Sequence, residues 1–114
     1  MKEFDPGGAP SIVSITDRVK PLALGGAVSS VHFLGDRAHF VGAEENIAIA
    51  TAEGEVTQTS VHFGAILCAA SDGKRIVTGG DDGKLIALDA KGETSVLATD
   101  AKRRWIDNVA VHPD

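Results

Sequence analysis

Histidine and cysteine are the residue types in this chain best suited to bind a transition metal. The four histidines lie at positions 32, 39, 62 and 112, without the short spacing that a zinc site requires. The single cysteine, Cys68, excludes an internal disulfide and any cysteine-based zinc pattern. Cys68 lies in the apolar run from Ile66 to Ala70, where a small buried thiol fits a core. The sequence therefore predicts no metal site.

Two glycine-containing patterns resemble ligand-binding loops without meeting their requirements. The segment Asp81-Asp82-Gly83 lacks the alternating oxygen ligands and the distal glutamate of a calcium loop, so a tight hairpin turn is the better interpretation. The glycine pairs at 25–26 and 79–80 precede no helix whose N-terminus could receive a phosphate. No serine stands in a nucleophile-elbow context. We therefore predict no catalytic residue and no cofactor.

One basic run, Lys102-Arg103-Arg104-Trp105, ends in the only tryptophan and is the candidate partner-binding surface. Cationic side chains beside an aromatic ring could hold an acidic partner or stack on a nucleic-acid base. The alternative is a solvated loop whose tryptophan anchors the following strand in the core. The sequence leaves both interpretations open.

The composition is that of a folded globular chain. Hydrophobic residues make up 43% of the 114 positions and charged residues 24%, which argues against disorder despite 13 glycines. The formal net charge of −5 disfavours nucleic acid and anionic membranes as partners. No secretion signal and no membrane-spanning run is visible, so the predicted location is cytoplasmic.

The elements that must position these residues are strands, because short apolar runs alternate with turn residues and no helical period appears. The clearest case is the hairpin from Ser71 to Asp89, whose apolar runs 75–78 and 84–88 flank the turn sequence Gly79-Gly80-Asp81-Asp82-Gly83. The fold class predicted is all-β. Further strands are expected at 11–16, 28–33, 38–41, 47–50, 56–61, 64–70, 94–98 and 109–111.

Internal repetition favours a propeller among the all-β architectures. The segment DRAHFVGAEENIAIATAEGE, at 36–55, aligns with DGKRIVTGGDDGKLIALDAKGE, at 72–93. Units of this size with four strands each are typical of propeller blades, which repeat every ~40–45 residues. The expected organisation is a flexible leader at 1–10, an amino-terminal closing strand at 11–16, a first blade at 25–61, a second blade at 62–99 and the start of a truncated third blade at 100–114.

The stretch from position 28 to the end resembles the WD-repeat β-propellers, most specifically in the central hairpin. Residues 78–89, TGGDDGKLIALD, are similar to the family's strand, tight turn and next strand, with Leu88-Asp89 where Trp-Asp is usual. His62 is similar to the histidine of the family's Gly-His pair. The resemblance implies a buried hydrogen-bond chain of His62, Thr78 and Asp82, whose last member is missing because Leu88 replaces the tryptophan.

The first blade departs further from the family pattern. Leu24 stands at the histidine position and Ala50-Thr51 at the Trp-Asp position, so an equivalent network is not expected there.

The function implied by the resemblance is a non-catalytic interaction scaffold that binds protein partners. A closed propeller has ~4–8 blades, so we expect this sequence to be the amino-terminal part of a longer propeller, or a short chain that self-associates through exposed blade edges. The alternative function is the structural part of a propeller enzyme, such as a quinoprotein-like oxidoreductase or a hydrolase, with its active site outside this stretch.

Overall fold

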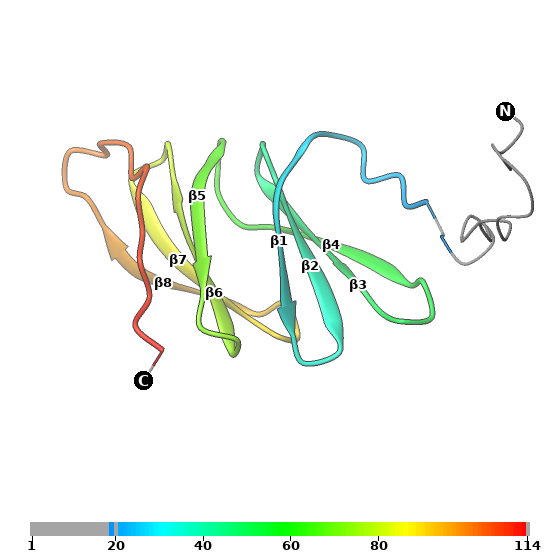
Figure 1. Ribbon diagram of the computed structural model, residues 1–114. Helices are drawn as coiled ribbons and strands as arrows, with labels where there is room; N and C mark the ends of the chain where they lie inside the picture. The colour runs from blue at the N-terminus through cyan, green and yellow to red at the C-terminus, as the bar shows by residue number, and fades with distance from the viewer. Residues whose placement is uncertain (1–18, 20, 114) are drawn as a thin grey trace, which may run out of the picture.

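The computed structural model describes residues 19 and 21–113, and this part of the chain is entirely β (Figure 1). Eight strands form two four-stranded antiparallel sheets. The all-β prediction is therefore confirmed, whereas the expected leader at 1–10 and strand at 11–16 lie outside the described residues. No helix that could cross a membrane occurs within the described range.

Each sheet is a meander in which strands adjacent in the sequence are also adjacent in the sheet. The first sheet consists of β1 (Val28–Leu34), β2 (Arg37–Gly42), β3 (Asn46–Ala50) and β4 (Val56–Ser60). The second sheet consists of β5 (Ile66–Ser71), β6 (Arg75–Gly80), β7 (Lys84–Asp89) and β8 (Thr94–Thr99).

The two sheets repeat one structural unit. β1 begins at Val28 and β5 at Ile66, and the same offset of 38 residues relates each later strand of the first sheet to its counterpart. Even the irregularity recurs, because the register shifts between Val28 and Ser30 in one sheet and between Ile66 and Cys68 in the other. A bulge bends a strand, so equivalent bulges give the two sheets the same local shape.

The turns between the last two strands of each sheet repeat as well. The Thr51 amide donates to the Glu55 carbonyl at 2.9 Å, and the Asp89 amide donates to the Glu93 carbonyl at 3.0 Å. The repeated unit thus extends through the turn. The offset of 38 residues agrees with the sequence alignment at Glu55 and Glu93, but it places Lys74, not Asp72, at the position equivalent to Asp36.

A core of aliphatic side chains joins the two sheets face to face. The first sheet contributes Val41, Ile47 and Ile49, and the second contributes Ile76, Ile86 and Leu88. Side chains alternate between the faces of a strand, so Ala87 points away from the face of Ile86 and Leu88. The offset of 38 residues makes Ala87 the counterpart of Ile49. Ile49 points into the core between the sheets, whereas Ala87 lies on the opposite face of its own sheet. The two sheets therefore pack through faces that are not equivalent, an arrangement here called head to tail.

Two expectations at the level of single elements are wrong. β6 continues through Gly80, so the connecting turn is Asp81 to Gly83, and in it only Gly83, with φ 75°, has a positive φ. Residues 109–111 form no strand, since they make no ladder with any described strand.

Candidate functional site

Three polar side chains from three separate elements meet at one end of the second sheet. His62 lies in the connection between β4 and β5, Thr78 lies on β6, and Asp82 lies in the turn between β6 and β7. The His62 Nδ1 atom is 2.9 Å from Asp82 Oδ1, and its Nε2 atom is 2.8 Å from Thr78 Oγ1. The structure thus brings together the three residues named by the family resemblance.

The carboxylate of Asp82 collects further donors from the backbone. The Phe63 amide donates to Oδ2 at 3.2 Å, and the Lys84 amide donates to Oδ1 at 3.1 Å. Burial opposes ionisation, but these two amides and the His62 ring outweigh it and hold the pKa of Asp82 below its ordinary value. One side chain thereby ties the β4–β5 connection to the β6–β7 turn.

The chemistry of this cluster is internal to the fold. The side chain of His62 is 0% exposed and that of Asp82 only 6%. Both ring nitrogens of His62 are engaged by Asp82 and Thr78, and His62 and Asp82 line an open depression beside Phe63. The Thr78 hydroxyl lies 3.4 Å from the Ile86 carbonyl, which continues the chain into β7. Leu88, the residue that the resemblance aligns with a tryptophan, is fully buried in the core.

Sequence reasoning missed the role of two adjacent glycines: Gly80 makes room for the cluster and Gly79 makes room for Ile106. A Cβ at Gly80 would collide with the His62 ring, and a Cβ at Gly79 would lie 2.5 Å from the Ile106 side chain. Neither glycine has a positive φ. The available signal was a glycine pair inside a strand, which often marks close approach of another group.

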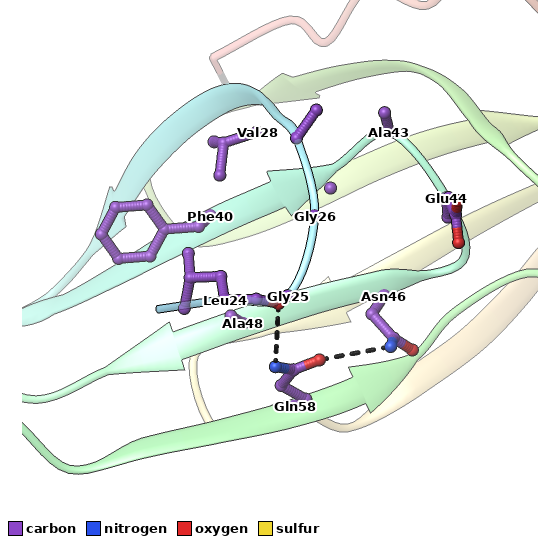
Figure 2. A pocket seen from close by; sticks show the side chains of 12 residues that line it. Leu24, Gly25, Gly26, Val28, Phe40, Ala43, Glu44, Asn46, Ala48 and Gln58 are labelled. Atoms are coloured by element: carbon purple, nitrogen blue, oxygen red, sulfur yellow. Dashed lines mark hydrogen bonds between the residues drawn. The ribbon is translucent and has the colours of Figure 1, made fainter. Parts of the chain in front are cut away.

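The equivalent place in the first sheet contains a hollow instead of a network (Figure 2). Leu24, Phe40 and Glu44 line it, at the counterpart positions of His62, Thr78 and Asp82. The Gln58 amide bridges to the Leu24 carbonyl at 3.3 Å, and the Asn46 amide donates to Gln58 at 3.2 Å. The hollow encloses about 70 Å³, whereas a small-molecule site needs ~300–1,000 Å³.

The basic run lies in the connection that follows β8 and is organised by Asp100. The Asp100 carboxylate accepts from the Lys102 amide at 3.1 Å and from the Arg104 amide at 2.9 Å. It also pairs with the Arg104 guanidinium through both oxygens, at 3.2 and 2.9 Å. The Arg104 side chain and amide lower the pKa of Asp100 to about 2, and the same bonds raise the pKa of Arg104.

The side chain of Trp105 is 70% exposed, so it does not anchor the following segment in the core. Ile106 does so: its amide donates to the Gly80 carbonyl at 3.1 Å, and its carbonyl accepts from the Cys68 thiol at 3.4 Å. Cys68 is half-buried beneath this contact, and burial raises the pKa of its thiol. In Figure 1 the segment (red) runs back along the second sheet.

The remaining candidate ligands are dispersed. Within the described range, no group of three or more histidine, cysteine, aspartate or glutamate side chains could hold a metal ion. His39 is fully buried between the sheets, and its Nε2 atom has no hydrogen-bond partner among the described residues. Burial lowers the pKa of His39, and the hydrogen bond from its ring to the Arg37 carbonyl only partly opposes this decrease. His39 is therefore a core residue.

Comparison with known proteins finds no family model, no curated protein and no solved structure that matches this chain.

Proposed function

We propose that this chain is a non-catalytic scaffold for protein–protein binding, built from propeller-like blades that resemble WD repeats. The observation that carries this proposal is the head-to-tail contact of the two repeated sheets. A contact between equivalent faces would close on itself, whereas a contact between non-equivalent faces can be repeated around a ring. Radial repetition of such units is the principle of a propeller.

The outer face of the first sheet has the properties that continued repetition requires. Val31 and Phe33 of the first sheet are exposed on the face that points away from the second sheet. The equivalent face of the second sheet is the one buried in the core between the sheets. Such faces are suited to a further blade or to another copy of the chain. Self-association through them stays a prediction, which light scattering of the purified chain tests.

The buried network supports a structural role over a catalytic one. A catalytic histidine needs a ring nitrogen free to transfer a proton, but both ring nitrogens of His62 are engaged, by Asp82 and by Thr78. Its hydrogen bonds connect two loops to an inner strand and keep one end of the second sheet in a fixed shape. A rigid sheet that presents fixed loops is what an interaction scaffold provides.

The test is binding of purified proteins to the native chain. Candidates are recovered by cross-linking to the immobilised chain, purified, and titrated against it by calorimetry. We expect saturable binding of defined stoichiometry that is lost when the chain is unfolded in urea. The proposal fails if no purified candidate binds saturably, or if the unfolded chain binds equally well.

A further inference from the structure

The connection from Asp100 to Ile106, here called the 100–106 loop, is held rigidly at the same end of the second sheet as the network. At its start, the Asp100 amide donates to the Gly83 carbonyl at 2.8 Å, and at its end Ile106 bonds to Gly80. Inside it, the Arg103 amide donates to the Asp100 carbonyl at 3.0 Å. The loop is thus fixed at both ends and in the middle.

The backbone of Arg103 has a left-handed conformation, with φ 55°, and Arg103 is the one non-glycine residue with positive φ in the described range. This conformation is unfavourable for a side chain with a Cβ, so the surrounding contacts must enforce it. One such contact is with Gly83, where a Cβ would lie 2.6 Å from the Arg103 Cα. The backbone of the loop therefore has a predetermined conformation.

The charges on the loop are not balanced. Asp100 neutralises Arg104, but Lys102 and Arg103 form no ion pair with any described residue and are exposed. The next carboxylate along the chain, Asp107, forms no ion pair with either of these cations. Two cations on a chain of net charge −5 are a local attraction for carboxylates rather than part of a general basic surface.

An apolar surface adjoins these cations. Trp105, Ile106 and Ala98, near the end of β8, line an open depression together with the polar Thr99 and the paired Asp100 and Arg104. An exposed tryptophan beside an arginine is the kind of side chain on which binding energy concentrates in protein interfaces. Because the loop is already ordered, a ligand would lose little free energy in fixing it.

We propose that the 100–106 loop binds an acidic peptide segment, with Lys102 and Arg103 pairing its carboxylates and the depression beside Trp105 receiving an apolar side chain. This inference rests on the proposed scaffold function and names the partner chemistry at one surface. A peptide fits better than a nucleic acid, because the acidic chain as a whole repels a long phosphate backbone.

Trp105 itself reports the binding, since the chain contains one tryptophan and no tyrosine. The full chain is titrated with a glutamate–leucine copolymer while the tryptophan emission is followed. We expect a saturable blue shift that weakens as salt is added, because exposed ion pairs are screened. A lysine–leucine copolymer and oligothymidylate serve as the opposite-charge and nucleic-acid probes and are expected to shift the Trp105 emission less.

The decisive variant combines Lys102→Gln with Arg103→Asn. Asparagine tolerates the left-handed backbone at position 103, so the charge is removed without added strain. We expect binding to weaken about tenfold, as two partly desolvated ion pairs are lost. Lys91→Gln, in the turn between β7 and β8 at the opposite end of the sheet, is the matched control and should bind like the unaltered chain.

Three results would overturn the inference: no saturable shift with the glutamate–leucine copolymer, equal weakening by Lys91→Gln, or tighter binding of oligothymidylate. Any of these results, found together with saturable binding of a purified protein partner to the native chain, would refute this surface and leave the scaffold function intact. Circular dichroism of each variant shows whether its sheets are folded.

Discussion

Replacement of Asp82 by alanine should lower the free energy of unfolding, because its carboxylate joins two loops at one end of the second sheet. The carboxylate accepts hydrogen bonds from the His62 ring and from the Phe63 and Lys84 amides. The bond to the buried ring is charge-assisted and worth ~1.5–3 kcal/mol, whereas the two amides lie near solvent and contribute ~0.5 kcal/mol each. Asp82→Ala should therefore lower the free energy of unfolding by about 3 kcal/mol.

The assay is urea denaturation followed by far-ultraviolet circular dichroism, because the exposed Trp105 is a poor reporter of the core. Asp81→Asn, in the same turn, is the control and should change the free energy of unfolding by less than about 0.5 kcal/mol. Asp82→Asn keeps one acceptor oxygen and should fall between the two. Equal effects of Asp82→Ala and Asp81→Asn would refute the assignment of a stabilising network.

The pH dependence of the Asp82 contribution has a defined sign. The pKa of Asp82 is lowered in the folded chain, so the unfolded chain binds its proton more readily. The contribution of Asp82 to stability is fully present above the pKa of ~3.9 that aspartate has in the unfolded chain. This contribution is lost as the pH falls through the lower pKa of the folded chain. The difference between Asp82→Asn and the unaltered chain should accordingly shrink below pH ~4. A difference that stays constant down to strongly acidic pH would contradict this account.

Two further predictions concern core positions. His39→Val should make the free energy of unfolding less dependent on pH. The pKa of His39 is lowered in the folded chain, so the unaltered chain loses stability below pH ~6.5, at up to ~1.4 kcal/mol per pH unit. Identical pH profiles of the two chains in urea denaturation would contradict this. Gly80→Ala should cost about 2 kcal/mol or more, because the added methyl group meets the His62 ring; Gly26→Ala, which meets nothing within 4 Å, is the control, and equal thermal midpoints for the two variants would refute the steric argument.

The strands were predictable because their signal is local. Alternating β-branched runs and turn residues placed β2, β3, β6 and β7 within a few residues of their positions. The expected strand at 109–111 failed because a ladder also needs a partner strand, which its own sequence does not specify.

The network residues could be named from the family resemblance, but the packing roles of Gly80, His39 and Asp100 could not. Gly80 is required by the position of a ring from another loop, and His39 is buried by the second sheet rather than by its own strand. Asp100 organises Lys102 and Arg104 through bonds to their amides. These contacts depend on three-dimensional packing, and no spacing in the sequence encodes them.

Amide hydrogen exchange of the full chain, with and without the glutamate–leucine copolymer, tests most directly whether this fold is a rigid scaffold with a binding loop. The scaffold account predicts that the strands of both sheets are protected from exchange and unchanged by the copolymer. It also predicts that the 100–106 loop alone gains protection. Strands that exchange as fast as an unfolded chain, or a loop whose exchange the copolymer does not slow, would contradict it.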